Sequence, residues 1–140
     1  MRLTLHEFCV GAVVVGALAT PLVIALVLPV QTEPDPRVGY TWISGRFIHV
    51  AGNAWQTVLP KQLDEMSDSS ETPTRSKLQL YENEKPIGPP HSRHTDIIDK
   101  GGGLYSHWRV PSGASILIFS ATDNSNPNWN WKRYSYRLQQ

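Results

Sequence analysis

The N-terminal part of the chain contains a run of 23 residues, Phe8 to Val30, without a single charged side chain. At about 1.5 Å of rise per residue, a helix of this length crosses a hydrocarbon layer of about 30 Å. The sequence therefore predicts one transmembrane helix over residues 8–30. A cleaved signal peptide is the alternative, because a small-x-small pattern occurs at Ala17 and Ala19. Cleavage there would leave an apolar N-terminus exposed to water, so an uncleaved anchor is favoured.

The charges that flank this segment predict its orientation. Arg2 and the α-amino group precede it, whereas Glu33 and Asp35 follow it. Positive charge near the end of a span favours the cytoplasmic side, and acidic residues contribute little. We therefore expect residues 1–7 in the cytoplasm of a bacterial cell, a single pass through the inner membrane, and the C-terminal domain in the periplasm.

Small residues recur within the predicted span. Ala12, Gly16 and Thr20 lie four positions apart and so share one helix face. Small side chains allow a second transmembrane helix to approach closely. The pattern favours a partner subunit in the membrane, although glycine and alanine are also common in spans that have no such partner.

Residues 31–37, QTEPDPR, form a short linker, because their two prolines favour an extended backbone. The remaining residues, 38–140, contain several runs of alternating apolar and polar positions between turn residues, which is the pattern of β-strands. ILIF, residues 116–119, predicts a central strand, and PSG, residues 111–113, predicts a hairpin loop before it. We expect a mainly β domain, a small antiparallel β-sandwich or open barrel behind the transmembrane helix. The predicted strands are 41–50, 54–59, 76–83, 104–110, 114–122 and 133–138.

Two stretches do not fit strands. Residues 60–76 are polar and predict a mobile loop with one helical turn at KQLDEM. Residues 87–108 run from an extended PPH segment through a short helix at HTDIIDK to three consecutive glycines, which we expect to end that helix. Consecutive glycines can also bind phosphate, but a phosphate loop needs a strand before it and a helix after it, and the order here is reversed.

Composition narrows the function classes. The chain has 13 Lys+Arg against 12 Asp+Glu, which leaves no basic excess for nucleic acid as a partner. It contains no G-x-S-x-G motif, and its one cysteine, Cys9, falls within the apolar run. Histidines and carboxylates are present for acid–base chemistry, but their spacing pairs none of them. Catalysis is therefore not indicated, and no cofactor is expected beyond the metal ions considered next.

The stretch 87–108 carries the residues best suited to a metal. His91 and His94 form H-x-x-H, and Asp96 and His107 follow. Zinc binds imidazole nitrogen and carboxylate oxygen, so these four residues are candidate ligands of a metal-dependent hydrolase. H-x-x-H without a second paired element is common by chance. The alternative is that His91 and His94 are solvated while His107 is hydrogen-bonded in a strand.

ATDNSNPN, residues 121–128, offers a second set of donors, which would suit calcium. Several hard oxygen atoms lie close together, but calcium takes about six to eight oxygens and usually more carboxylates. An Asx-turn at the end of the preceding strand explains the same residues. The candidate ligands are Asp123, Asn124, Ser125 and Asn126.

All five tryptophans of the chain lie between residues 42 and 131. Trp129 and Trp131 are two apart in NPNWNWKRY, so an extended backbone would place both on one face. Aromatic faces beside amide and guanidinium donors suit sugar rings. Tryptophan beside basic residues is also favoured at a membrane interface, and core packing is the remaining interpretation. The predicted ligand-binding residues are Trp108, Asn128, Trp129, Asn130, Trp131 and Arg133.

Four motifs follow one another in the second half of the chain: L-x-L-Y-E-N-x-K-P-I-G-P-P-H, H-x-D-I, G-G-G-x-Y-S-H-W and F-S-A-T-D-N-S-x-P-N. They cover about 60 residues. Together they resemble a short β-rich module of bacterial cell-surface and carbohydrate-related proteins. The resemblance implies a recurring domain appended to envelope polysaccharide machinery, and it implies no activity. In this sequence the module stands almost alone behind a membrane anchor, unlike its usual setting.

These observations predict a membrane-anchored, non-catalytic binding or accessory protein of the bacterial cell envelope. We expect it to bind a glycan or a protein partner through its aromatic, asparagine-rich surface. An accessory subunit of a larger membrane complex, held through its transmembrane helix, is the first alternative. A metal-dependent hydrolase is the second.

Overall fold

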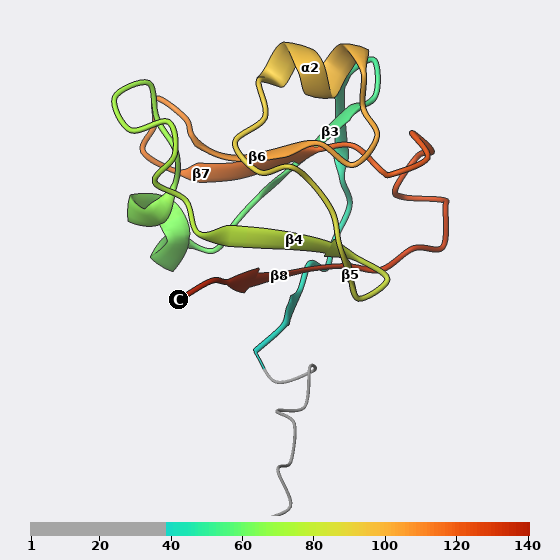
Figure 1. The fold of residues 1–140 in the computed structure, drawn as a ribbon, viewed down its shortest axis with the longest axis horizontal. Helices are drawn as coiled ribbons and strands as arrows, with labels where there is room; N and C mark the ends of the chain where they lie inside the picture. The colour runs from blue at the N-terminus through green and yellow to red at the C-terminus, as the bar shows by residue number, and fades with distance from the viewer. Residues whose placement is uncertain (1–38) are drawn as a thin grey trace, which may run out of the picture. The chain divides into compact units, whose positions relative to one another are not determined.

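The computed structural model describes residues 39–140, which form two antiparallel four-stranded sheets (Figure 1). The strand order is β1-β8-β4-β5 in one sheet and β2-β3-β7-β6 in the other. The prediction of a mainly β, antiparallel domain is confirmed, with two sheets as in a β-sandwich. The strands are β1 (Thr41–Trp42), β2 (Ile48–Ala51), β3 (Ala54–Val58), β4 (Leu78–Glu82), β5 (Lys85–Pro86), β6 (Tyr105–Arg109), β7 (Ser115–Phe119) and β8 (Tyr134–Leu138). Two short helices complete the domain, the 3₁₀ helix η1 (Lys61–Met66) and the α-helix α2 (His94–Asp99).

The predicted transmembrane helix and linker, with Ala12, Gly16 and Thr20, lie outside the described residues. Between residues 39 and 140, no helix is long and apolar enough to cross a membrane.

The predicted strand 41–50 is divided between the two sheets. Its first part, β1, pairs with β8, whereas its second part, β2, pairs with β3. The chain passes from one sheet to the other at Gly45, whose φ of 115° is a conformation that side-chain-bearing residues rarely adopt. Phe47 follows this bend and is buried in the core. The alternating pattern of residues 41–50 did not predict this break at Gly45, because apolar and polar positions alternate in the same way before and after the glycine.

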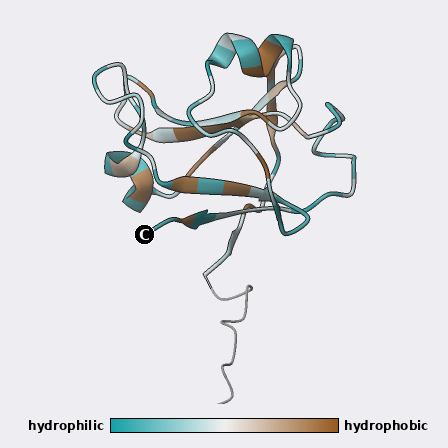
Figure 2. Cartoon of the chain, in the orientation of Figure 1, coloured by the Kyte–Doolittle hydropathy of each residue, from teal (hydrophilic) through white to brown (hydrophobic). Residues whose placement is uncertain are grey.

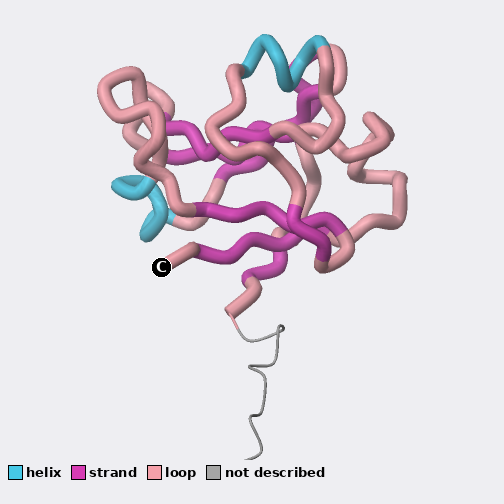
Figure 3. The backbone as a smooth tube through the Cα atoms, viewed as in Figure 1, coloured by secondary structure: helices cyan, strands magenta, loops and turns pink. Residues whose placement is uncertain are grey.

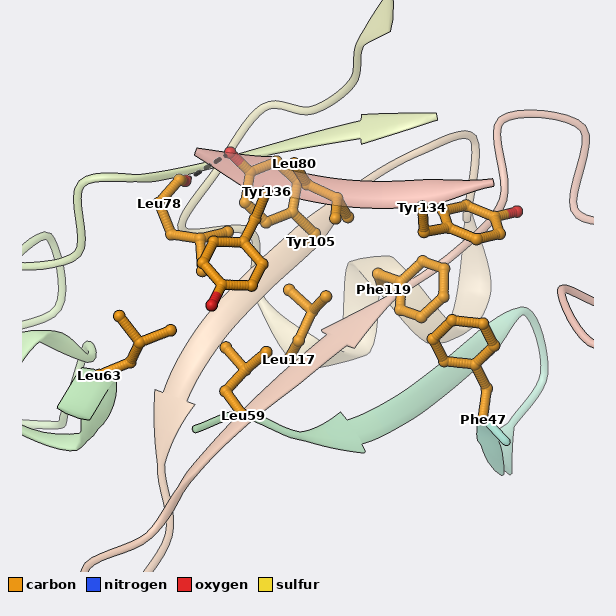
Figure 4. Packing of buried hydrophobic residues seen from close by; sticks show 10 residues of the cluster. All are labelled: Phe47, Leu59, Leu63, Leu78, Leu80, Tyr105, Leu117, Phe119, Tyr134 and Tyr136. Carbon is orange, nitrogen blue, oxygen red and sulfur yellow. Dashed lines mark hydrogen bonds between the residues drawn. The ribbon is translucent and has the colours of Figure 1, made fainter. Parts of the chain in front are cut away.

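The core lies between the two sheets and is rich in aromatic rings (Figure 4). Phe47, Phe119 and Tyr134 contact one another with ring centroids 5.0–5.5 Å apart. The hydroxyl of Tyr105 is buried and donates a hydrogen bond of 2.8 Å to the carbonyl of Leu78, so this polar atom is satisfied within the apolar core. Figure 2 shows apolar residues concentrated along these strands. The buried members of the cluster are Phe47, Leu59, Leu63, Leu78, Leu80, Tyr105, Leu117, Phe119, Tyr134 and Tyr136.

Strand β7 is central, as predicted from its apolar residues on both faces. It pairs with β3 on one side and with β6 on the other. Leu117 and Phe119 face the core between the sheets, whereas Ile118 packs with Ala54 and Ile97 beneath α2. The helix therefore covers the outer face of this sheet (Figures 1 and 3). The PSG hairpin is also confirmed, since the N–H of Val110 donates to the carbonyl of Ala114 at 2.9 Å.

Residues 60–76 contain the predicted helical turn, η1, but the prediction of a mobile loop is wrong. Leu63 is buried in the core, and Ser67, Asp68 and Ser76 are buried polar residues. The backbone of Asp68 bonds to both His107 and Arg109, which attaches this segment to β6. This stretch is therefore an anchored segment: a few of its residues are buried and bonded to the domain, while its other polar residues face solvent.

Replacement of Leu117 by alanine should destabilise the domain strongly, because its side chain is fully buried between the sheets. We expect a loss of about 3 kcal/mol in the free energy of unfolding, typical of a leucine-to-alanine change in a core. Val58→Ala on the neighbouring strand is the matched control, because Val58 is exposed, and it should cost about 1 kcal/mol or less. Urea unfolding of residues 38–140, followed by circular dichroism, measures both. Equal losses would contradict the assignment of the two faces.

Candidate functional site

A pocket of about 360 Å³ lies beside the start of α2, against the outer face of β6. Its volume falls within the range of about 300–1,000 Å³ that is usual for small-molecule sites. Three residues singled out from the sequence, His91, His94 and Trp108, line it together. We call it the α2 pocket; its walls are Pro73, His91, Ser92, Arg93, His94, Thr95, Ser106 and Trp108.

His91 is held in place by a buried carboxylate. Asp68 is 1% exposed, and its Oδ2 lies 2.6 Å from the Nδ1 of His91. The other oxygen, Oδ1, accepts a hydrogen bond of 2.8 Å from the backbone N–H of Ser76. The hydrogen bond between Nδ1 and Oδ2 fixes the orientation of the His91 ring, and Nε2 has no hydrogen-bond partner among the described residues. The pocket is thus lined by an imidazole of fixed orientation.

The backbone at His91 is also unusual. Its φ of 57° lies in the left-handed region, which costs a non-glycine residue about 1–2 kcal/mol. The next residue, Ser92, donates its N–H to the carbonyl of Tyr105 at 3.0 Å, which holds this conformation against β6. Strained residues that are retained in this way occur often at binding and catalytic sites.

His94 forms a second wall of the pocket with Trp108. The two rings meet edge to face, with centroids 5.2 Å apart and an interplanar angle of 81°. Burial lowers the pKa of His94 below its usual range, so the ring is neutral at pH 7. Its Nε2 is buried and has no hydrogen-bond partner within residues 39–140. Unpaired buried polar atoms are rare, and this nitrogen shares that condition with Nε2 of His107 in the core.

A larger hollow of about 740 Å³ lies along β8, beside the last residues of the chain. Its walls include Gly39, Gln139 and Gln140, and it contains no histidine or tryptophan. We place the candidate site at the α2 pocket, because only there does an aromatic face meet two imidazoles of fixed position within the described part of the chain.

The four predicted metal ligands do not converge. His91 and His94 line the α2 pocket, but His107 lies on the inner face of β6, and Asp96 forms an ion pair of 2.9 Å with Lys100. Across residues 39–140, no group of three His, Cys, Asp or Glu side chains is placed to hold a metal. The geometry of the described domain therefore gives the hydrolase interpretation no support.

His107 belongs to the core rather than to the pocket. Its Nδ1 lies 2.8 Å from the Oγ of Ser76, and the ring is buried. Burial lowers the pKa of His107 to about 4, while the negative charges of Asp68 and Asp64 raise it by smaller amounts. The ring is therefore neutral at pH 7, and the expectation of a hydrogen-bonded strand histidine is confirmed.

The donors proposed for calcium are used within the loop. Asp123 accepts from the N–H of Ser125 at 3.1 Å and from its Oγ at 2.6 Å, and it pairs with Lys132 at 2.9 Å. These contacts lower the pKa of Asp123. Asn124 accepts a hydrogen bond of 2.7 Å from the N–H of Gly102. The bond from Ser125 N–H to the Asp123 side chain is the predicted Asx-turn.

The predicted sugar-binding residues separate into two places. Trp108 lies in the α2 pocket, while the others lie in residues 126–133, which we call the tryptophan loop. This loop is a turn rather than an extended segment, because the N–H of Trp129 donates to the carbonyl of Asn126 at 3.0 Å. Trp129 and Trp131 are 73% and 96% exposed. The guanidinium of Arg133 stacks over Trp42, 4.1 Å from the ring centroid.

The asparagine amides of the tryptophan loop are already bonded within the domain. Asn128 accepts from the N–H of Phe47 at 2.8 Å and donates to its carbonyl at 3.0 Å. Asn130 donates to the hydroxyl of Tyr134 at 2.9 Å and accepts from the N–H of Lys132 at 3.0 Å. These two residues therefore brace the loop, and their amides are not available to a sugar without loss of those bonds.

No family model, curated protein or solved structure was found to match this chain. The resemblance to a module of cell-surface proteins therefore stays a prediction.

Several residues of the four motifs hold loops together. Glu82, in the LYEN segment, is buried and accepts hydrogen bonds from the N–H of Thr122 and from Nζ of Lys132, each at 3.0 Å. Gly101 has a φ of 64° and packs so closely against the side chain of Asn124 that a Cβ atom would overlap with it. These motif residues thus have structural roles that the fold explains.

Asp68 is the residue of the site that sequence reasoning missed. It stands in a polar stretch, DEMSDSSETPT, where nothing distinguishes it from its neighbours. Its role comes from a contact with His91, 23 positions later in the chain. The local sequence therefore carries no signal for this role.

The buried His107 should make the domain less stable in acid. Its pKa is lowered to about 4 in the folded state, against an ordinary value of 6.5. As the pH falls, the His107 ring is therefore protonated in the unfolded chain before it is protonated in the folded domain. The free energy of unfolding then decreases between about pH 6.5 and about pH 4. Between pH 7 and pH 4.5 we expect the wild type to lose about 2.5 kcal/mol more than His107→Gln in urea unfolding.

His49→Gln is the control for this titration, since His49 lies on the exposed strand β2. It should keep the pH dependence of the wild type. An NMR titration of the His107 ring with a midpoint near 6.5 would contradict the prediction.

Proposed function

We propose that this chain is a membrane-anchored, non-catalytic binding protein of the bacterial cell envelope, whose α2 pocket holds one sugar residue of an envelope glycan. The observation that carries the proposal is the meeting of Trp108, His91 and His94 in one pocket of about 360 Å³. The predicted span over residues 8–30, with residues 1–7 in the cytoplasm, places the domain in the periplasm, close to the inner membrane.

The chemistry of the pocket suits a ring that carries hydroxyl groups. The indole of Trp108 offers an apolar face for the C–H side of a sugar. His91 contributes an Nε2 that lacks a partner in the described domain, and imidazole nitrogens exchange hydrogen bonds with hydroxyls. Because Asp68 fixes His91 and Trp108 contacts His94, both rings are oriented before a ligand arrives.

Binding is favoured over catalysis because the His91–Asp68 pair has no adjacent nucleophile. The hydroxyl of Ser92 donates to the carbonyl of Pro89 at 2.7 Å and is engaged in the loop. Nucleophilic catalysis needs a hydroxyl or thiol within hydrogen-bond reach of its base. The structure of residues 39–140 shows no such pair with His91, whereas a fixed imidazole serves equally well to orient a bound hydroxyl.

Removal of the aromatic wall should weaken glycan binding. We expect Trp108→Ala to raise the Kd for the bound polysaccharide at least tenfold, a loss of about 1.4 kcal/mol. Affinity electrophoresis of the full chain, in a detergent without sugar headgroups, through gels that contain peptidoglycan fragments or capsular polysaccharide measures the retardation. Trp131→Ala is the matched control, because this tryptophan is exposed and lies outside the pocket.

Two further variants separate the roles of the histidines. His94→Ala removes a pocket wall directly, whereas Asp68→Asn leaves His91 in the chain but weakens the bond that orients it. Both should reduce retardation while thermal unfolding shows a folded domain. Equal retardation of wild type and Trp108→Ala, or no retardation of the wild type by any envelope polysaccharide, would overturn the proposal.

A further inference from the structure

The tryptophan loop exposes more aromatic surface than the fold requires. Trp131 is 96% exposed, Trp129 is 73% exposed, and Trp42, on the adjacent strand β1, is 41% exposed. Burial of apolar surface is the main contribution that a large ring makes to stability, so these indoles add little to the fold. Exposed apolar patches often mark interaction sites, and the stacking of Arg133 on Trp42 brings the loop and β1 together.

The conformation of the loop keeps these indole rings exposed to solvent. Trp131 has a φ of 60°, a left-handed conformation that is unfavourable for a tryptophan. On either side of it, Asn130 bonds to Tyr134 and to the N–H of Lys132. The segment between β7 and β8 extends from one side of the two sheets (Figure 1), where it is attached to the core through Asn128 and Phe47. The indoles are therefore presented by a braced turn.

The charges beside these indoles are positive. Arg133 stacks on Trp42, and Arg46 is exposed next to Phe47. The nearby carboxylates, Glu82 and Asp123, both form ion pairs with Lys132. Their negative charges therefore neutralise that lysine and leave the positive charges of the arginines uncompensated. Tryptophan together with arginine is the combination enriched at the headgroup level of membranes, where anionic lipids attract basic side chains.

The polar groups of the loop favour lipid over sugar as its partner. Recognition of a sugar needs polar groups directed at the ligand beside the aromatic ring. The amides of Asn128 and Asn130 are bonded to the domain itself. A headgroup layer makes no such demand, because it accepts indoles and cationic groups without a fixed pattern of hydrogen bonds.

The length of the chain allows this contact. Only ten residues, 31–40, separate the end of the predicted span from β1. Ten residues reach at most about 35 Å when fully extended. A domain of about 100 residues has a radius of gyration of about 13 Å. Trp42 is the second residue of β1, and a connection of this length does not prevent this side of the domain from reaching the bilayer surface.

We propose that the tryptophan loop, together with Trp42 and Arg133, rests on the lipid headgroups of the membrane in which the chain is anchored. The inference depends on the transmembrane anchor of the proposed function but not on the α2 pocket. The contact holds the domain against the bilayer and fixes its orientation, so that the α2 pocket is presented in a constant direction.

Tryptophan fluorescence tests this contact directly, because all five tryptophans lie outside residues 8–30 and the span contributes no signal. The full chain is reconstituted into vesicles of phosphatidylcholine and phosphatidylglycerol, with and without dibrominated acyl chains close to the headgroups, which quench indoles at the interface. We expect clear quenching of the wild type. The double variant Trp129→Ser and Trp131→Ser should lose more than half of it.

Trp55→Phe is the control, because it removes one tryptophan outside the loop, and it should retain the quenching of the wild type. Flotation of the same vesicles after alkaline extraction checks the anchor independently. A chain that does not float shows that the anchor is wrong. A chain that floats without quenching, or whose quenching is unchanged in the double variant, overturns the contact with lipid. Loss of polysaccharide retardation in the double variant, without quenching in the wild type, would identify the loop as a glycan surface instead.

Discussion

The buried carboxylate of Asp68 joins three segments that are far apart in the sequence, and the α2 pocket depends on it. Its backbone pairs with β6, one carboxylate oxygen bonds to the N–H of Ser76, and the other bonds to His91. A buried carboxylate is unfavourable unless its oxygens are hydrogen-bonded or paired with a cation. Here the groups that satisfy Asp68 are the same groups that shape the pocket. The stability of the domain and the orientation of His91 are therefore coupled, and a change that frees His91 also leaves a buried carboxyl oxygen without a hydrogen-bond partner.

Glu82 is a second buried carboxylate that joins distant segments, in this case β4 and the connection between β7 and β8. Burial alone would raise its pKa, but hydrogen bonds from Thr122 and from Lys132 outweigh this effect and lower it. The carboxylate connects β4 to both ends of the connection between β7 and β8, because Thr122 lies near its start and Lys132 near its end. A long connection would otherwise be free to fluctuate, and its ordering carries an entropic cost. The hydrogen bonds to Glu82 offset part of that cost and keep the tryptophan loop in one conformation.

Local features of the domain could be predicted from the sequence, and features that depend on distant contacts could not. The central strand β7, the PSG hairpin, the turn at KQLDEM and the short helix ended by Gly101 all follow from the order of residues within a few positions. The break at Gly45 depends on which sheet accepts each half of the segment, and the role of Asp68 depends on His91 and β6. Both features depend on contacts between residues far apart in the sequence, which the local pattern of apolar and polar residues does not reveal. The histidines were singled out as metal ligands, and their separation into pocket and core follows from the direction of each side chain on β6 and α2.

The tryptophans show most clearly how the fold divides residues that look equivalent in sequence. Trp108 and Trp131 both stand beside polar and basic residues, and each suits either a sugar or a membrane surface. The fold places Trp108 against His94 in the wall of a pocket of limited volume, where several polar side chains lie beside the ring. It places Trp131 on a braced turn with nearly all of its surface exposed, where it can contact a broad surface but cannot enclose a ligand. A pocket favours recognition of one sugar residue, whereas an exposed side chain favours contact with an extended surface such as a lipid headgroup layer. A tethered domain with both a binding pocket and a membrane-contacting loop would hold the pocket at a fixed height and direction above the bilayer. Fewer orientations of the domain would then be lost on glycan binding, which lowers the entropic cost of binding.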